Sequence, residues 1–190
     1  MATGTRSEVD QAREDEERRA AQAQIRQFPD PVLQQRARAI ETFDEDLAAL
    51  AERMIRLMHQ AHGAGLAAPQ IGLLRRLFVY QAGEDAEPLA LVNPEIVEAS
   101  EETAVDGEGC LSLDVLIRSE VPVPVERPVR VRVRASDVHG APFEREVEGH
   151  EARVIQHELD HLDGTLILDR TTPEARREAM RTLRLARTAR

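Results

Sequence analysis

The sequence predicts a single α+β domain in which mixed or antiparallel strands surround a central helix, with a further helix at the C-terminus. The length of 190 residues and the 42% of hydrophobic residues suit one domain with a substantial core. Apolar residues recur at helical spacing between Asp44 and His62, whereas Val and Arg alternate strictly over residues 129–134. Helices and strands that do not alternate regularly along the chain are typical of the α+β class.

The two ends of the chain differ from its middle in composition. Residues 1–26 are rich in Arg, Glu, Ala and Gln and contain few apolar anchors, so we expect a charged extension that is disordered or a solvated helix. Thr172 and Pro173 suit a cap and the first position of a helix. We therefore expect one domain over residues 27–172 and an Arg-rich helix over residues 173–190.

The first helix of the domain is expected from Asp44, a suitable N-cap, to His62. Gly63 and Gly65 then break the helical pattern. The apolar stripe of this helix consists of Leu47, Leu50, Met54, Leu57 and Met58.

Short apolar runs predict the strands. The first two are Leu77–Tyr80 and Leu89–Asn93, the second ended by Pro94. Over residues 129–134 we expect Val to face the core and Arg to face solvent, and the following His139-Gly140 suits a hairpin turn. A last strand is expected over Thr165–Leu168.

The central helix carries the pattern His-Glu-x-x-His as His157, Glu158 and His161. Residues four apart lie one turn apart on a helix, so both imidazoles share one face and could bind one metal ion, while Glu158 could move a proton. A core helix with two hydrogen-bonded histidines is the alternative. The opposite, polar side of the helix would carry Arg153, Gln156, Asp160 and Asp163.

A catalytic metal site usually has three protein ligands and one open position. No His follows His161, and the chain has a single Cys, Cys110, which cannot form an internal disulfide. Cys110 is therefore either a small buried hydrophobe or a thiolate ligand. A Cys-His-His set with an open position would suit zinc or iron.

Three motifs in order give the chain a family resemblance, and the segment Phe28–Leu33 precedes them. The motifs are Gly63-Ala64-Gly65-Leu66-Ala67-Ala68-Pro69-Gln70, Glu108-Gly109-Cys110-Leu111-Ser112 and His157-Glu158-Leu159-Asp160-His161. With these motifs the sequence resembles the peptide deformylases, of the iron-dependent bacterial type, over roughly residues 26–172.

The resemblance implies a hydrolase that removes the N-formyl group from N-formylmethionine at the start of newly made polypeptides and releases formate. Cys110, His157 and His161 would hold one divalent metal ion. The expected ion is Fe²⁺, which Zn²⁺, Ni²⁺ or Co²⁺ could replace. A metal-bound hydroxide would attack the formyl carbon, with Glu158 as general base and then general acid.

The resemblance also implies roles for other residues of the motifs. The Gln70 side chain and the Leu111 N–H would stabilise the oxyanion, and Gly65 would belong to the catalytic set. Glu108 would either support Gln70 or form a local salt bridge. The expected substrate-binding positions are Gly63, Ala64, Glu108, Gly109, Arg153 and Val154.

The chain departs from the family pattern after the second motif. Asp114 stands where a Pro is usual, and the Arg of a later Val-Pro-Arg is displaced onto Arg127, so the loop over residues 113–126 is unusual. The expected pocket for the Met side chain is also unusually polar, which suggests polar groups at its rim or altered selectivity. The positions expected to border it are Ala64, Asp106, His150, Arg153 and Val154.

Composition bounds location and partners. The chain has no apolar run near 18 residues, no signal-like N-terminus and one Cys, which together indicate a cytoplasmic protein without a membrane span. The net charge of −10 argues against a general nucleic-acid binder. The resemblance, rather than composition, implies nascent formylated polypeptides as partners, and we expect a monomer.

The C-terminal segment has a charge opposite to that of the whole chain. Residues 170–190 hold seven Arg against Glu174 and Glu178, a local balance of +5. This basic end could dock on an acidic surface, and the resemblance to the peptide deformylases, some of which contact the ribosome through a C-terminal helix, implies the ribosome as that surface. The alternative is a solvated helix packed through Leu183 and Leu185.

Two other functions remain open at this point. A zincin-like peptidase shares the His-Glu-x-x-His chemistry, although the sequence lacks its downstream His. A metal-binding or interaction protein without enzymatic activity is the other.

Overall fold

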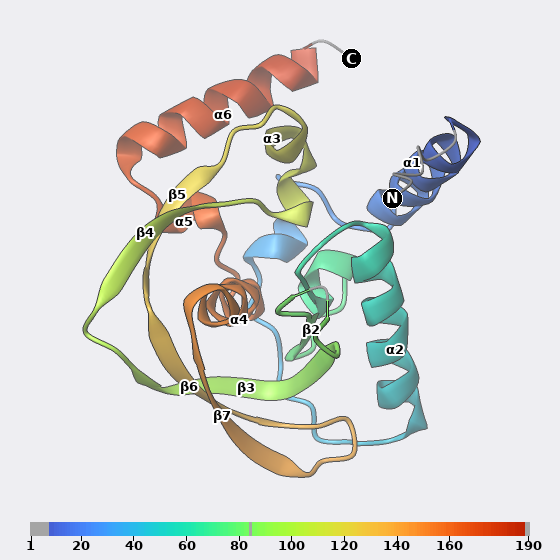
Figure 1. Cartoon of the computed structure of the whole chain (residues 1–190), viewed down its shortest axis with the longest axis vertical. Coiled ribbons are helices and arrows are strands. Elements are labelled where there is room, and N and C mark those ends of the chain that lie inside the picture. The colour runs from blue at the N-terminus through green and yellow to red at the C-terminus, as the bar shows by residue number, and fades with distance from the viewer. Residues whose placement is uncertain (1–7, 84, 189–190) are drawn as a thin grey trace, which may run out of the picture.

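The computed structural model describes residues 8–83 and 85–188 and has the α+β architecture expected from the sequence (Figure 1). Five antiparallel strands form a sheet in the order β1-β2-β3-β6-β7, and β4 and β5 form a separate antiparallel ribbon. In chain order the strands are β1 (Gly65–Ala67), β2 (Leu77–Tyr80), β3 (Leu89–Ala99), β4 (Thr103–Glu108), β5 (Val123–Pro128), β6 (Arg130–Ser136) and β7 (Pro142–Glu148).

The helices surround the strands, except for α4, which lies between the sheet and the β4–β5 ribbon (Figure 1). Among the described residues, no helix is long and apolar enough to cross a membrane. The α-helices are α1 (Glu8–Gln22), α2 (Glu45–Gln60), α3 (Asp114–Arg118), α4 (Gly149–Leu162), α5 (Ile167–Arg170) and α6 (Pro173–Thr188). Short 3-10 turns cover Pro31–Gln34, Ala68–Ile71 and Leu111–Leu113.

Helix α2 confirms the prediction from apolar spacing. The Asp44 carboxylate accepts a hydrogen bond from the Leu47 N–H at 2.9 Å, so it is the N-cap. The predicted stripe packs on β1 and β2 and is buried, apart from the half-buried Leu50. This packing places the end of α2 immediately before the first motif.

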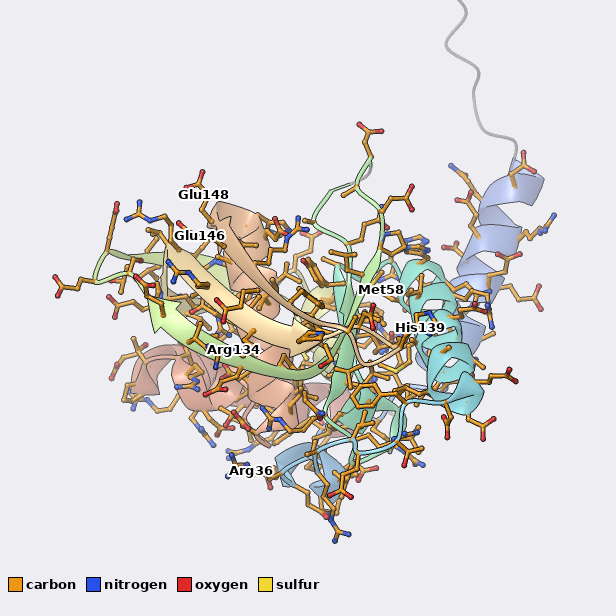
Figure 2. All side chains as sticks on the ribbon, turned by 90° about the horizontal axis from the view of Figure 1, so that it is seen from below. Arg36, Met58, Arg134, His139, Glu146 and Glu148 are labelled. Atoms are coloured by element: carbon orange, nitrogen blue, oxygen red, sulfur yellow. The ribbon has the colours of Figure 1, made fainter. Side chains whose placement is uncertain are left out.

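The β6–β7 hairpin also follows the prediction. Val131 and Val133 are buried, whereas Arg134 is exposed and pairs with Glu144 at 2.8 Å. Figure 2 shows Arg134 of β6 and Glu146 of β7 among the charged side chains on the solvent-facing side of the hairpin. The outward Arg residues therefore belong to a solvated, ion-paired sheet face.

One predicted strand boundary and one predicted strand were wrong. Strand β3 continues through Pro94 to Ala99, because its register shifts between Val92 and Glu95, and at such a bulge a Pro need not donate to the ladder. The segment predicted as a last strand instead enters helix α5 at Ile167. A short apolar run does not distinguish a buried strand from a buried helical turn.

The two terminal helices pack on the domain. In α1, the predicted solvated helix, most side chains are exposed, but Ala21 in its last turn is 1% exposed. In α6, Ala179 and Leu183 are buried against α3 and β5, whereas Leu185, expected to pack, is 60% exposed. Residues 1–7 and 189–190 of the two predicted terminal segments lie outside the described residues.

The polar side of α4 differs from the simple amphipathic expectation. Gln156 and Asp160 are each only 6% exposed, because strand β5 packs against this side of the helix and Arg170 of α5 binds Asp160 there. Gln156 donates to the Pro128 carbonyl at 3.0 Å, and Asp160 accepts from Arg127 at 2.9 Å. Both faces of α4 are therefore internal, and the polar one is held by hydrogen bonds and ion pairs.

Candidate active site

Helix α4 places the two histidines of the motif one turn apart. The His157 and His161 ring centroids are 5.0 Å apart, with an angle of 74° between the rings. The helix ends before Gly164, whose φ is +73° and where a Cβ would lie 2.7 Å from the Gln34 carbonyl oxygen. Gly164 therefore permits the turn that ends α4, and its missing side chain lets the backbone at Gln34 lie close to that turn.

Cys110 reaches the histidines from the loop that follows β4. It is 3% exposed, and its Sγ lies 3.3 Å from His161 Nε2. Each of Cys110, His157 and His161 offers a ligand atom, and these atoms lie within 4.8 Å of one another. One thiol and two imidazoles at this separation fit a single soft or borderline divalent ion, whose usual tetrahedral coordination would leave a fourth position for another ligand.

Glu108 orients one of the imidazoles. Its Oε2 lies 2.9 Å from His157 Nδ1, which leaves Nε2 as the other ring nitrogen for a ligand bond. Burial lowers the pKa of His157, but hydrogen bonds to Cys110 and Glu108 outweigh it and hold the pKa well above its usual range. Burial lowers the pKa of His161 well below that range, and the charge of His157 adds to the effect.

Glu108 belongs to a buried ion-pair network, which is the salt-bridge alternative of the sequence analysis. Arg127 binds both of its carboxylate oxygens, at 2.6 and 2.9 Å, and also binds Asp160 at 2.9 Å. Burial raises the pKa of Glu108, but hydrogen bonds from Arg127 and His157 bring it down to about 2. The network fixes the carboxylate on His157 and ties β4, β5 and α4 together.

Arg153 also binds Glu108 and lines the cavity described below. Its Nη1 donates to Glu108 at 2.8 Å and to the Val125 carbonyl at 2.9 Å, and its Nη2 donates to the Ala104 carbonyl at 2.8 Å. The guanidinium therefore has protein partners, so it is not a free charge in the cavity. The polarity noted from the sequence falls instead on Asp106 and His150, which are exposed.

Glu158 is buried beside Cys110, His157 and His161, the three candidate ligands. Its side chain is 4% exposed, and Oε2 has no hydrogen-bond partner in the described part of the chain. Burial raises the pKa of Glu158 to about 7, although the charge of His157 opposes this and that of Glu108 adds to it. A carboxylate with such a pKa can accept and return a proton near neutral pH.

The first motif makes room for side chains of the other two. A Cβ on Gly65 would lie 2.3 Å from Glu158 Oε1, and a Cβ on Gly63 would lie 2.7 Å from Leu111 Cδ1. Neither distance is compatible with an unmoved neighbour. These glycines therefore set the positions of Glu158 and Leu111, a role that the sequence analysis did not foresee.

Gln70 has an orientation fixed by hydrogen bonds. Its Oε1 accepts from the Ala67 N–H at 2.8 Å, so the amide nitrogen points the other way. That nitrogen lies 3.2 Å from Ser112 Oγ and 3.8 Å from Cys110 Sγ. The Gln70 N–H donors thus face the second motif beside the Cys110 sulfur.

These groups open onto a cavity of about 410 Å³. The structure brings to its wall the expected residues Gly63, Ala64, Gly65, Gln70, Asp106, Glu108, Gly109, Cys110, Leu111, His150, Arg153, Val154, His157 and Glu158. His161 lies behind this wall, 1% exposed. The sequence analysis missed His62, Gly107 and Ile117, which also line the cavity. Ile117 belongs to the unusual loop over residues 113–126, where helix α3 forms. His62 and Gly107 directly precede the first and second motifs in the sequence, and this position could have indicated that they line the cavity.

Comparisons with known proteins agree on one family. The family model for polypeptide deformylase matches residues 22–177. The peptide deformylase of Thermotoga neapolitana is 49% identical over 152 residues, which are 80% of this chain and 88% of the relative. The relative from Clostridium botulinum is 47% identical over 148 residues, 78% of this chain and 95% of the relative.

Solved structures agree with the sequence relatives. The crystal structure of peptide deformylase from Thermotoga maritima matches with a TM-score of 0.73 and 48% identity, covering 78% of this chain and 97% of that one. Peptide deformylase 1B of Arabidopsis thaliana, in complex with an inhibitor, matches with a TM-score of 0.79 and 34% identity, covering 86% and 89%. Most of α1 precedes the region that the family model matches.

Proposed function

The chain belongs to the polypeptide deformylase family, whose reaction is removal of the N-formyl group from N-formylmethionine on nascent peptides, and we propose how its residues carry out this hydrolysis. The observation that carries the assignment is the convergence of Cys110, His157 and His161, with the buried Glu158 carboxylate beside them.

We propose Cys110, His157 and His161 as the ligands of one divalent ion, with Fe²⁺ as the native metal. A bound ion would lower the pKa of a water toward neutrality and polarise the formyl carbonyl. The thiol supports this choice, because thiolate ligands suit iron and zinc better than Mg²⁺ or Ca²⁺. Zn²⁺, Ni²⁺ and Co²⁺ would be replacements in the same ligand set.

Glu158 would act as the proton carrier. It takes a proton from the attacking water as the water oxygen bonds to the formyl carbon, and it gives that proton to the amine as the C–N bond breaks. The products are formate and a free amino terminus. Burial supports this role, because it raises the pKa of Glu158 to about 7. Near neutral pH the carboxylate can then exist both in the deprotonated form that the first step needs and in the protonated form that the second step needs.

Gln70 and Leu111 would stabilise the oxyanion that forms on the formyl oxygen. The Gln70 amide nitrogen is aimed toward Cys110 by the hydrogen bond that its oxygen accepts from Ala67. The Leu111 N–H follows Cys110 directly in the chain. Donors that are held in place before the reaction stabilise the developing charge without a reorganisation cost.

The wall of the cavity would hold the formylmethionyl end. Gly63, Ala64, Gly109 and Val154 would contact it directly, because they are small or apolar and line the cavity. Glu108 and Arg153 would shape the wall through their ion pair. We propose Gly65 as part of the catalytic set because it makes room for Glu158.

We further propose a cytoplasmic monomer that meets its substrate at the ribosome through α6. Arg177, Arg181 and Arg184 on this helix are exposed, which supports contact with an anionic surface. A triple Arg→Glu variant tests the contact better than deletion of residues 173–190, because deletion would expose the core that Leu183 covers. Unchanged co-sedimentation of that variant with ribosomes would contradict the contact.

Formate release tests the proposed chemistry. Protein purified anaerobically with Fe²⁺ should release formate from formyl-Met-Ala-Ser and leave unformylated Met-Ala-Ser intact. Cleavage of the unformylated peptide would favour a peptidase. A folded, metal-loaded protein inactive on both peptides would favour a non-enzymatic role.

A further inference from the structure

Two side-chain amides converge on the carbonyl oxygen of Leu111, behind the cavity wall. Gln22 Nε2 donates to it at 2.6 Å and Gln27 Nε2 donates at 2.9 Å. Gln22 is the last residue of α1 and lies 89 positions from Leu111 in sequence. The end of the N-terminal helix therefore touches the loop that carries a metal ligand and a proposed oxyanion donor.

The chain that follows Gln22 joins the same loop to the Gln70 motif. The Arg26 N–H donates to the Gln70 carbonyl at 2.7 Å, and the Phe28 N–H donates to the Ser112 carbonyl at 2.9 Å. Residues 22–28 thus bridge the two loops from which the proposed oxyanion donors come. Because each bond ends on a backbone carbonyl, the bridge constrains the backbone of these loops.

The end of α1 is itself anchored in the core. Ala21 is 1% exposed and Ile25 is 4% exposed, and both belong to the hydrophobic cluster that contains Leu111. The preceding turns of α1 are mostly exposed, so the anchored part of the helix is the part that carries Gln22. Because the backbone of Gln22 is fixed by this packing, its side-chain amide can restrain the Leu111 carbonyl more effectively than the amide of a mobile glutamine could.

We propose that Gln22 is a positioning residue for deformylation: through its hydrogen bond to the Leu111 carbonyl, α1 holds the second motif in the geometry that presents the Leu111 N–H to the formyl oxygen. Gln22 acts through Leu111 and is 2.6 Å from its carbonyl oxygen rather than among the residues lining the cavity. The inference rests on the oxyanion role proposed above for Leu111.

The variant Gln22→Met tests the inference, because Met keeps the length of the side chain and removes the amide donor. With Fe²⁺-loaded protein and formyl-Met-Ala-Ser, kcat should fall about threefold to tenfold while KM stays within about twofold. A loss confined to kcat is expected when a contact matters only in the transition state. The matched control is Gln11→Met on the exposed part of α1, which should leave both constants unchanged. Equal kcat values for the two variants would overturn the inference.

A spectroscopic measurement separates the contact from its effect on rate. The amide of Ser112 is bonded to the Leu111 carbonyl carbon, so its ¹⁵N chemical shift in the Zn²⁺-loaded protein reports hydrogen bonds to that carbonyl. Gln22→Met should move the Ser112 signal, and Gln11→Met should not. An unmoved signal would overturn the contact, and a moved signal with unchanged kcat would overturn the positioning role. Failure of the wild-type protein to release formate would instead count against the proposed function.

Discussion

Replacing Gly65 with Ala probes the position of Glu158 without removing its carboxylate. The added Cβ would lie 2.3 Å from Oε1, 2.6 Å from Cδ and 2.7 Å from Cγ of Glu158, whereas ordinary contacts begin near 3.4 Å. The carboxylate must therefore move by about 1 Å. A displacement of about 1 Å at a reacting group costs roughly 100-fold in rate, or about 2.7 kcal/mol in the activation barrier.

The assay is formate release from formyl-Met-Ala-Ser, with metal content measured on the same samples. Gly65→Ala should bind metal like the wild type, because Glu158 is not one of the three proposed ligands, and its kcat should fall about 100-fold. Gly83→Ala is the matched control, because a Cβ there would have no atom within 4 Å and Gly83 is not among the residues that line the cavity, and its kcat should stay within about threefold.

A double-mutant cycle shows whether the loss arises from the contact itself. Glu158→Ala lacks the Cγ, Cδ and Oε1 atoms that the added methyl would meet, so Gly65→Ala should cost much less residual activity in the Glu158→Ala background than in the wild type. Full activity of Gly65→Ala, or strictly additive losses in the cycle, would refute the reasoning that the Gly65 gap sets the carboxylate position.

Three further perturbations address the ligands, the ion-pair network and the titration of the site. Cys110→Ser should weaken Fe²⁺ binding about 100-fold or more, which is a larger loss than is usual for a residue that only supports a metal ligand. Metal titration against a competing chelator measures this affinity, and an unchanged affinity would contradict the assignment of Cys110 as a ligand. Arg127→Met should lower the free energy of unfolding by about 3–5 kcal/mol in urea titrations, because it leaves the buried Glu108 and Asp160 carboxylates without this partner; a loss below about 1 kcal/mol would argue against the network. Burial raises the pKa of Glu158 from 4.5 to about 7, so the folded metal-free protein retains a proton that the unfolded chain releases, and stability should fall as pH rises between these values. Relative to metal-free Glu158→Gln, the wild type should lose about 3 kcal/mol between pH 4.5 and 7, and a pH-independent difference would contradict the raised pKa.

Helical periodicity and motif spacing predicted much of the fold and of the site. The 3.6-residue repeat was enough to place His157 and His161 side by side, because both lie on one helix. Cys110 could be proposed as their partner because it is the only Cys and belongs to a motif. Its distance of 3.3 Å from His161 depends on how β4 returns to α4, which local patterns do not determine.

Contacts between distant segments were not predictable in the same way. The polar side of α4 was expected to be the solvent side, but strand β5 packs against it, and Arg127 neutralises Asp160 there. Gln22 and Gln27 carried no signal at all, since a glutamine amide that binds a backbone carbonyl has no sequence pattern. Pro94 was read as the end of a strand because the bulge that accommodates it depends on the register with β6.

The most direct test of the account is formate release by Glu158→Gln alongside the wild type, with one metal ion per chain confirmed in both. The account predicts full metal content and a loss of kcat of about 100-fold or more, because the attacking water and the leaving amine lose their proton carrier. Wild-type turnover in the metal-loaded Glu158→Gln protein would contradict the central claim that Glu158, held beside Cys110, His157 and His161, moves the proton.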